Sequence, residues 1–252
     1  MLNYLWRLLA TAFSFATFGA GGLFLSCLVF PAILFLTKDK KIRRERIRFV
    51  ISRSFGFFFK MMVFLGLFRL TIIGEELVKS DKGCLIISNH PSLVDVISLI
   101  SLYPNSCCIV KKELWRNPFL GGVVSAAGYI RNDQVETILE QCKTSIDQGE
   151  VIIIFPEGTR TIVGKEMILQ RGAAHIALRL NCPIRTIQIR VNPTTLTKAE
   201  PWYSIPTKRA EFVVEIKDIL DVSGLLDKKM PISLAARKLT RLIKENIDAD
   251  YA

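Results

Sequence analysis

Two segments of this chain carry side chains that could move a proton and hold an anion. The first is Asn89-His90-Pro91-Ser92-Leu93-Val94-Asp95, in which one of the chain's two histidines precedes an aspartate by five positions. Histidine is the side chain that most readily takes and returns a proton near neutral pH. A carboxylate within reach fixes the tautomer of the ring and stabilises the imidazolium that forms. The pair His90 and Asp95 is therefore a candidate general base with its orienting acid. On this local sequence alone, Asn89 could equally be a helix cap beside an unrelated histidine and aspartate.

The second segment, Phe155-Pro156-Glu157-Gly158-Thr159-Arg160, offers groups that suit an anionic ligand. Arg160 presents a planar fork of donors that matches a phosphate, and Gly158 would let backbone amides approach an anion closely. Glu157 and Thr159 add a carboxylate and a hydroxyl to the same turn. The segment predicts a substrate-binding turn, although a surface turn with a solvated arginine has the same composition.

Both segments follow apolar runs that read as buried strands, Cys84 to Ser88 and Val151 to Phe155. Strands and helices alternate along most of the chain, which favours an α/β fold with a mostly parallel sheet flanked by helices. Ligands of such sheets bind at the carboxyl ends of the strands, where both segments lie. We expect further strands at 70–73, 107–111, 184–191 and 212–216, and helices at 93–102, 135–147, 166–180 and 232–246. A helix starting near Pro91 would place Asp95 about one turn further on, within reach of His90.

Together the two segments resemble the motifs of the glycerolipid acyltransferase family, the lysophosphatidic acid acyltransferase-like enzymes. That family has Asn-His-x-x-x-x-Asp followed, some tens of residues later, by Phe-Pro-Glu-Gly-Thr-Arg. Between them, Lys111-Lys112-Glu113-Leu114 and Pro118-Phe119-Leu120-Gly121 resemble its Lys-x-Glu-Leu and Pro-x-x-Gly stretch. Asn181-Cys182-Pro183-Ile184 resembles its fourth block, so the likeness covers roughly residues 70–217.

The resemblance implies an enzyme, an O-acyltransferase that moves a fatty acyl group from a thioester to the hydroxyl of a lysophospholipid. The first acceptor it suggests is 1-acyl-glycerol-3-phosphate, which would give phosphatidic acid. In this scheme His90 removes the hydroxyl proton, Asp95 orients His90, and Arg160 holds the phosphate. Lys111 stabilises the oxyanion, and Glu157 positions the acceptor's glycerol portion or Arg160. The acyl donor would be acyl carrier protein or a coenzyme A thioester as co-substrate, with no further cofactor.

One block departs from the family pattern Gly-x-x-Phe-Ile-x-Arg. Here the segment is Gly128-Tyr129-Ile130-Arg131-Asn132-Asp133, so that Arg131 follows the glycine by three residues rather than six. Arg131 is a candidate for the acceptor's head group, or a solvated arginine at a strand end. The departure keeps open another acceptor, such as a different lysophospholipid, a lyso-amino-acid lipid, a glycolipid or a pigment. A catalytically silent lipid-binding membrane protein is the remaining alternative.

The first part of the chain predicts an integral membrane protein. Half of the 252 residues are hydrophobic and the net charge is +11, and the stretch Leu8 to Leu36 contains no charged residue. Since about 20 apolar residues cross a bilayer as a helix, residues 1–37 are expected to form a transmembrane helix. The basic cluster Lys38 to Arg48 follows directly and places the catalytic domain on the cytoplasmic face, as at a bacterial inner membrane.

Residues 38–69 are interpreted as a basic linker and an interfacial amphipathic helix, and residues 70–252 as the α/β acyltransferase domain. Arg46, Arg53 and Lys60 recur every seven residues and would face lipid phosphates from one side of that helix. A second spanning helix, forming a hairpin with the first, is the alternative. The expected partners are membrane lipids and the acyl donor, and not nucleic acid, because no basic face mixed with aromatics is apparent.

Six cysteines are scattered without any Cys-x-x-Cys pair, and the two histidines lie far apart. This usage fits a reduced domain facing the cytosol, with most cysteines as small buried hydrophobes. No metal site is expected. The oligomeric state is unknown from sequence.

Overall fold

The computed structural model describes residues 2–162, 164–225 and 230–248. A seven-stranded sheet in the order β1-β7-β6-β2-β5-β3-β4 forms its centre. The strands are β1 (Phe68–Ile73), β2 (Leu85–Ser88), β3 (Cys107–Lys111), β4 (Ile130–Asn132), β5 (Ile152–Ile154), β6 (Ile184–Asn192) and β7 (Ala210–Leu220). The helices are α1 (Leu2–Phe24), α2 (Phe30–Leu36), α3 (Lys40–Phe64), α4 (Asp95–Leu102), α5 (Gly121–Ala126), α6 (Val135–Asp147), α7 (Gly172–Leu180) and α8 (Ile232–Ile247).

Neighbouring strands run parallel throughout the sheet except for the pair β6 and β7, which is antiparallel. The predicted α/β class with a mostly parallel sheet is therefore confirmed. The strands β6, β2, β5, β3 and β4 point the same way, so their carboxyl ends share one edge of the sheet. Everything that follows these strands in sequence is delivered to that edge.

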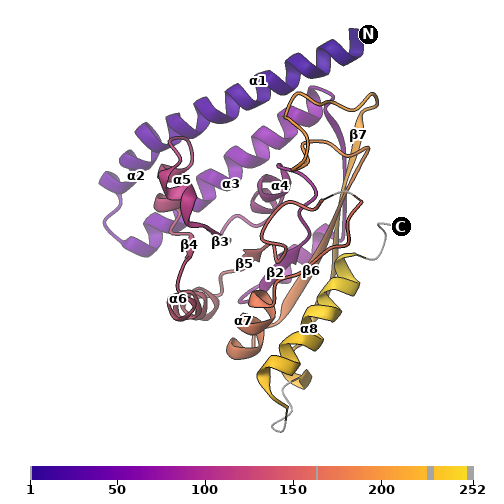
Figure 1. Ribbon diagram of the computed structural model, residues 1–252. Coiled ribbons are helices and arrows are strands. Elements are labelled where there is room, and N and C mark those ends of the chain that lie inside the picture. Colours follow the sequence, from indigo (N-terminus) through magenta and orange to yellow (C-terminus); the bar gives the residue numbers. More distant parts are fainter. Residues whose placement is uncertain (1, 163, 226–229, 249–252) are drawn as a thin grey trace.

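Helices cover both faces of the sheet (Figure 1). α3 and α4 pack against each other on one side, and α7 and α8 pack against each other on the other. The central strands are buried on both faces, since all four residues of β2 and all three of β5 lie in the core. This explains why these strands are continuous apolar runs rather than alternating patterns.

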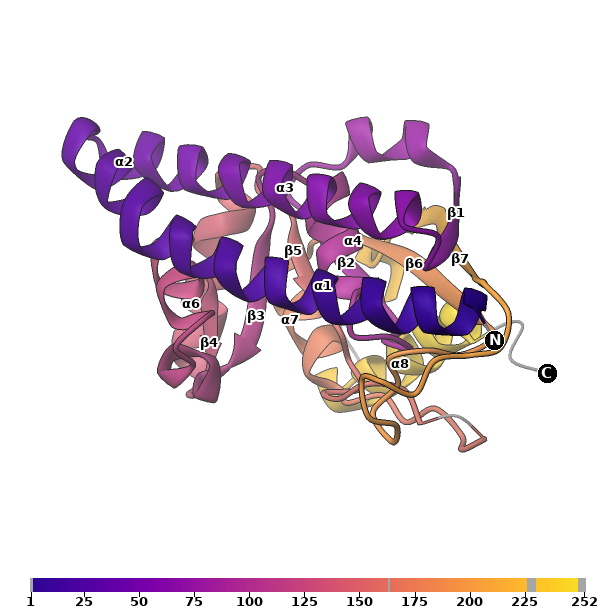
Figure 2. The same cartoon turned by 90° about the horizontal axis from the view of Figure 1, so that it is seen from above.

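The apolar N-terminal run folds into an almost continuous helix, as expected. A π-helical turn at Leu25–Val29 joins α1 to α2. Pro31 lies at the start of α2 and has no N–H to donate to the preceding turn, so the wider turn accommodates its ring. α1 and α3 lie side by side across one face of the molecule (Figure 2).

The prediction of a basic linker after residue 38 is wrong. α3 begins at Lys40, directly after Asp39, whose side chain caps the helix by accepting a hydrogen bond from the Ile42 amide at 2.9 Å. The basic cluster is therefore helical. Ile47 and Arg48 at its end are buried against the domain. An N-terminal carboxylate cap also favours a helix over a flexible connection.

Two expected helices begin later than predicted, and two short elements were not predicted. The helix expected over 166–180 begins only at Gly172, and the helix expected from Leu93 begins at Asp95. The short elements β4 and α5 were not predicted, because three and six residues are too few to show a periodicity. The expected strands are confirmed to within a few residues at each end.

Candidate active site

His90 and Asp95 meet at the carboxyl end of β2. The His90 Nδ1 lies 2.9 Å from the Asp95 Oδ2, and the same oxygen accepts a hydrogen bond from the Ser92 amide at 2.7 Å. A turn between Pro91 and Val94, not a helical turn, brings the two side chains together, because α4 starts at Asp95 itself. The Asp95 side chain is fully buried, whereas 16% of the His90 side chain is exposed. The ring can therefore meet a substrate while its partner stays shielded from water.

The electrostatics of this pair follow from its burial. Burial raises the pKa of Asp95 to about 6, against the opposing effects of its hydrogen bond and charge interaction with His90. When Asp95 is ionised it accepts a hydrogen bond from the protonated Nδ1 of His90, which leaves the Nε2 lone pair of His90 available as a base. The Phe155 ring centre lies 4.4 Å from that of His90, so one side of the imidazole is in contact with an apolar surface.

Asn89 fixes the end of β2 rather than capping a helix. Its Nδ2 donates to the Ile189 carbonyl at 2.8 Å, and its Oδ1 accepts from the Ile189 amide at 2.7 Å. The side chain is fully buried. It thereby ties the residue before His90 to β6, and the alternative of a helix-capping Asn89 is wrong.

Glu157 and Thr161 hold the backbone of His90. The His90 amide donates to Glu157 Oε1 at 2.9 Å and to Thr161 Oγ1 at 3.3 Å, and the Thr161 amide donates to the His90 carbonyl at 2.7 Å. The Thr161 hydroxyl in turn donates to Glu157 Oε1 at 2.7 Å. Burial raises the pKa of Glu157, and its hydrogen bonds with Thr161 and the His90 amide oppose the rise. The carboxylate of Glu157 thus bonds to the backbone of His90 and to Thr161 rather than to Arg160, and its expected contact with the acceptor's glycerol portion stays a prediction.

Arg160 supports a neighbouring loop. Its Nη1 donates to the carbonyls of Leu196 and Thr197 at 2.9 and 2.8 Å. The Leu93 amide also donates to the Leu196 carbonyl, at 3.1 Å. Gly158 has a φ of +66°, a left-handed conformation that favours glycine, and Thr159 is half-buried beside it. One nitrogen of the Arg160 guanidinium is thus engaged with the protein.

Comparison with known proteins agrees with this geometry. Residues 69–190 match the family profile described as Acyltransferase. This chain carries an acyltransferase-family domain. The family resemblance drawn from the motifs is therefore confirmed, and the matched residues include His90, Asp95 and the turn from Glu157 to Thr161.

Relatives and a solved structure resemble the acyltransferase domain. A Helicobacter pylori protein named 1-acyl-sn-glycerol-3-phosphate acyltransferase is 35% identical over 143 residues, covering 53% of this chain and 60% of that protein. A Cocos nucifera protein of the same name is 29% identical over 189 residues, covering 65% and 60% respectively. The chain thus spans about three fifths of the length of these relatives. The crystal structure of the 1-acyl-sn-glycerophosphate (LPA) acyltransferase PlsC from Thermotoga maritima superposes with a TM-score of 0.66 at 19% identity, covering 97% of this chain and 96% of that one.

Lys111 and Arg131 lie further along the same edge of the acyltransferase domain. Lys111 ends β3 and is exposed, and it pairs in register with Asn132 of β4. Arg131 forms an ion pair with Asp133 at 3.1 Å. Since β5 separates β2 from β3, and strands lie about 4.8 Å apart, Lys111 is about 10 Å and Arg131 about 14 Å along the edge from His90. The structure therefore brings Glu157 to the dyad and leaves these two cations at a distance suited to another part of a substrate.

The N-terminal helix reaches the same edge. The Arg7 Nη2 donates to the Thr207 carbonyl at 2.7 Å, and the Phe15 ring lies 5.8 Å from that of Trp202. At Gly22 an added Cβ would lie 2.9 Å from the Phe119 carbonyl oxygen, so the helix and this loop are in close contact. These partners belong to the loops that follow β6 and β3. α1 therefore lies beside the candidate active site.

The described part of the chain shows no group of three or more His, Cys, Asp or Glu residues that could hold a metal ion. Five of the six cysteines are buried, as expected, and Cys27 is exposed. The sequence did not predict the hydrogen bonds by which Glu157 and Thr161 hold the His90 backbone. The only indication was a hydroxyl residue, Thr161, directly after Arg160, and the sequence does not show which backbone groups this hydroxyl contacts.

Proposed function

We propose that this protein transfers an acyl chain from a thioester to the hydroxyl of a lysophospholipid at a membrane surface. The observation that carries the proposal is the 2.9 Å contact between His90 Nδ1 and the buried Asp95 carboxylate, within an acyltransferase-family domain. The dyad is a base that lacks a nucleophilic serine of its own, so the acceptor alcohol is the nucleophile.

The reaction balances without a covalent enzyme intermediate. His90 Nε2 takes the proton of the acceptor hydroxyl as its oxygen forms a bond to the thioester carbonyl carbon. The carbon–sulfur bond then breaks, and the imidazolium returns its proton to the departing thiolate. Asp95 stabilises the imidazolium between these two steps. Base catalysis of this kind typically contributes a factor of about 10²–10⁴ in rate.

Lys111 and Arg160 are the proposed ligands of the substrate's negative charges. Lys111 is exposed at the end of β3, about 10 Å along the edge from His90, and is available to the acceptor phosphate rather than to the oxyanion beside His90. Arg160 keeps donors besides the nitrogen that binds the 196–197 carbonyls. The acyl donor is a thioester of acyl carrier protein or of coenzyme A, and both are acidic partners for a chain of net charge +11.

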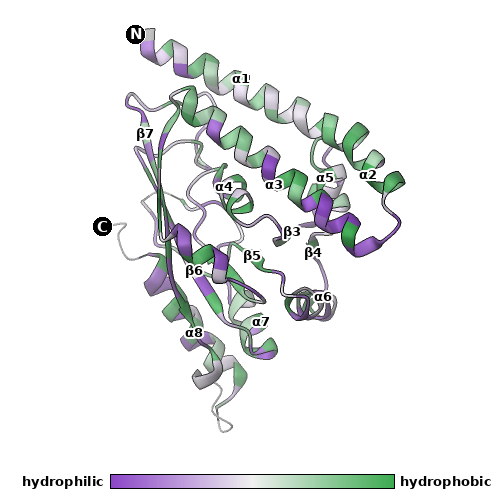
Figure 3. Cartoon of the chain, turned by 180° about the vertical axis from the view of Figure 1, so that it is seen from behind, coloured by the Kyte–Doolittle hydropathy of each residue, from purple (hydrophilic) through white to green (hydrophobic). Residues whose placement is uncertain are grey.

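The helices α1, α2 and α3 would bring the domain to the lipid. Asn3–Leu36 is long and apolar enough to cross a bilayer by length and composition, and α1 and α2 are hydrophobic along most of their length (Figure 3). Residues 6–26 of this run also contact α3 and the loops at the catalytic edge, at positions Trp6, Arg7, Phe15 and Gly22. We therefore favour a helix pair that inserts its exposed apolar side chains into one leaflet, while a spanning helix stays a prediction.

One side of α3 supports this orientation. Its exposed residues, spaced three or four apart, alternate between apolar and basic side chains: Ile42, Arg46, Phe49, Arg53, Phe57, Lys60 and Phe64. Aromatic rings in the acyl region and cations at the phosphates are what an interfacial helix requires. Because basic residues follow the apolar run directly, we place this lipid surface on the cytoplasmic face, as at a bacterial inner membrane.

The first acceptor to test is 1-acyl-sn-glycerol-3-phosphate, after the names of the relatives, with phosphatidic acid as the product. Purified full-length protein is incubated with an acyl thioester and a lysophospholipid in mixed micelles, and products are identified by mass spectrometry. We expect acyl transfer by the wild type and a loss of about 10²–10⁴-fold in His90→Ala. His175→Ala is the matched control: it removes the chain's second histidine, which lies on α7, and should keep its activity. Equal activity of His90→Ala and wild type would exclude this mechanism, and an inactive wild type that still binds vesicles would favour a silent lipid-binding protein.

A further inference from the structure

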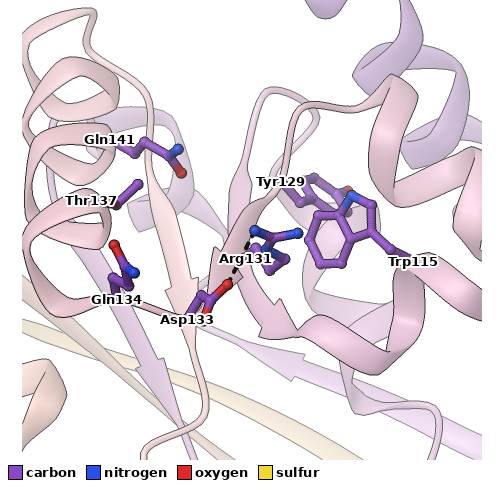
Figure 4. A pocket seen from close by; sticks show the side chains of 7 residues that line it. All are labelled: Trp115, Tyr129, Arg131, Asp133, Gln134, Thr137 and Gln141. Atoms are coloured by element: carbon purple, nitrogen blue, oxygen red, sulfur yellow. Dashed lines mark ion pairs between the residues drawn. The ribbon is translucent and has the colours of Figure 1, made fainter.

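A polar pocket lies beside the active site at the end of β4. It has a volume of about 380 Å³ and lies between α6 and the 3₁₀ turn Lys112–Arg116 (Figure 4). Seven residues line it: Trp115, Tyr129, Arg131, Asp133, Gln134, Thr137 and Gln141. No step of the proposed transfer uses this pocket, although it opens at the sheet edge that holds His90.

The lining of the pocket is polar but carries no net charge. Arg131 is neutralised by Asp133 at 3.1 Å, and Gln134, Thr137 and Gln141 supply two amides and a hydroxyl. These three residues are spaced three and four apart, so they project from one side of the start of α6. Trp115 closes the opposite wall next to Arg131 (Figure 4). A primary amide both donates and accepts hydrogen bonds, as a ligand hydroxyl does, whereas a bare phosphate would need uncompensated positive charge.

The strand order relates this pocket to the reacting hydroxyl. Along the edge, His90 follows β2, Lys111 ends β3, and the pocket begins at the end of β4. Neighbouring strands are about 4.8 Å apart, so the pocket begins about 14 Å from His90, with Lys111 between them. A glycerophospholipid has the same linear order: a reacting hydroxyl, then a phosphate, then whatever the phosphate carries.

From this correspondence we propose that the pocket binds an uncharged, hydroxyl-bearing head group attached to the phosphate of the lysophospholipid acceptor. The inference rests on the proposed acyl transfer and narrows its acceptor to lysolipids with a polyol beyond the phosphate. The phosphate lies over Lys111, the polyol hydroxyls exchange hydrogen bonds with Thr137 and Gln141, and its carbon face lies against Trp115. A site built to hydrogen-bond a substrate hydroxyl discriminates strongly against analogues that lack it.

The test compares lysolipids with the same acyl chain and different head groups. Wild-type kcat/KM is measured with lysophosphatidylglycerol, lysophosphatidate and lysophosphatidylethanolamine as acceptors. We expect the glycerol head group to be preferred by tenfold or more over the bare phosphate and over the ammonium head group. The double variant Thr137→Val with Gln141→Leu keeps the side-chain volumes close to those of the wild type but removes the hydrogen bonds, so it should abolish this preference by lowering kcat/KM for lysophosphatidylglycerol.

Lys143→Gln, on the outer side of α6, is the control and should keep the wild-type preference. A wild type that prefers lysophosphatidate, or a preference that survives in the double variant, would overturn the inference. A double variant with a raised KM for the coenzyme A thioester, and an unchanged one for the acceptor, would assign the pocket to the donor nucleotide instead.

A binding measurement separates this inference from the proposed function. Soluble glycerophosphoglycerol and glycerol 3-phosphate are titrated into the full chain while indole fluorescence is followed, with Trp115→Phe identifying the signal of this residue. Saturable quenching by glycerophosphoglycerol alone, lost in the double variant, supports the pocket even if no lysolipid is acylated. Absence of quenching by glycerophosphoglycerol, in a protein that acylates lysophosphatidate, refutes the pocket and leaves the acyl transfer intact.

Discussion

His90 works within a set of contacts that reach its side chain and its backbone separately. Asp95 holds the ring through Nδ1, while Glu157 and Thr161 hold the amide and carbonyl. Asn89 anchors the preceding residue to β6. Rotation of the ring and displacement of its Cα are therefore controlled by different residues, which lets their contributions be separated by experiment.

The pKa of Asp95 predicts the acidic limit of activity. Burial raises this pKa to about 6, and a protonated Asp95 no longer offers a carboxylate that accepts the Nδ1–H hydrogen bond and stabilises the imidazolium of His90. We therefore expect kcat/KM to fall as the pH decreases through about 6, with an apparent pKa that belongs to the pair. The measurement is the rate between about pH 5 and pH 8 in mixed micelles. A profile that is flat across this range would contradict the assignment.

The raised pKa of Asp95 should also make the free energy of unfolding depend on pH, and this dependence tests the pKa independently of activity. Asp in an unfolded chain titrates near 3.9, so between about pH 4 and pH 6 the folded state retains a proton that the unfolded chain has released. The free energy of unfolding of the wild type should consequently decrease with rising pH in this window, relative to that of Asp95→Asn. Denaturant titrations of both proteins at several pH values measure this difference, which should be absent if Asp95 titrates normally.

Substitutions of Glu157 distinguish a positioning residue from one that binds the acceptor. Glu157→Gln keeps an oxygen that accepts from the His90 amide and from Thr161, so it should retain most of the activity. Glu157→Ala frees the His90 backbone and should lower kcat by about 10²-fold, the typical cost of a small misplacement. The KM for the acceptor should change little in either variant. A KM that rises in both variants, with kcat preserved, would instead place Glu157 at the substrate.

At the scale of elements, α3 is joined to the domain by a buried ion pair. Arg48 Nη1 lies 2.9 Å from Glu150 Oε2 just before β5, and its Nε donates to the Ala127 carbonyl at the end of α5 at 2.9 Å. Both charged side chains are almost fully buried. Arg48 therefore does not face lipid, although its neighbours in the basic cluster are solvent-exposed or half-buried.

Replacing one member of this ion pair should lower the free energy of unfolding more than replacing both. Arg48→Met removes one of the two arginines that pair with the buried Glu150 carboxylate, while Arg44 Nη2 still lies 2.9 Å from Glu150 Oε1. Removing one partner of a buried ion pair typically costs about 3–5 kcal/mol, and the Arg44 contact should keep the loss toward the lower end of that range. The double variant Arg48→Met with Glu150→Leu replaces both charges by apolar groups and should recover most of that loss. Denaturant unfolding of the four proteins in this cycle measures the coupling. Additive effects of the two single substitutions would show that the pair is not coupled.

At the scale of the molecule, the helix pair α1 and α3 lies beside the sheet edge that carries the candidate active site. α1 contacts the loops after β3 and β6, and α3 lies beside it (Figure 2). The exposed residues of α3 alternate between apolar and basic side chains. Under the proposed function, this arrangement would let an acceptor present its hydroxyl to His90 while its acyl chain stays in the lipid. The opposite side of the domain carries α8, far from this surface (Figure 1).

Replacing the basic residues of α3 should weaken membrane binding. Each Lys or Arg near an anionic surface contributes about 1 kcal/mol, so changing Arg46, Arg53 and Lys60 to Gln should reduce affinity for anionic vesicles by about 10²-fold. Vesicle flotation at low and high salt measures the effect, which should shrink as salt rises. The matched control changes Arg237, Lys238 and Arg241 of α8, which are exposed, and should bind like the wild type. Equal loss in both variants would mean that net charge alone attracts the protein to lipid.

The amino-acid sequence by itself determined the strands, their burial and the residues at their ends. Continuous apolar runs such as Val151 to Phe155 are buried on both sides when helices cover both faces of a sheet. The polar residues that follow such a strand then lie at the edge of the sheet. This reasoning, with the motif resemblance, placed His90, Asp95 and the turn from Glu157 to Arg160 correctly at one edge. It also identified the apolar N-terminal run as helical.

The tertiary structure decided which partner each polar group meets. The hydrogen bond between Asn89 and Ile189 joins residues a hundred positions apart, and the ion pair of Arg48 with Glu150 spans a similar separation. Glu157 bonds to the His90 amide, and Arg160 bonds to carbonyls near Leu196. Hydrophobic periodicity records whether a side chain is buried, but a charged or amide side chain can bond to any complementary group that the fold brings near. Only the pairing order of the strands and the paths of the loops fix that choice.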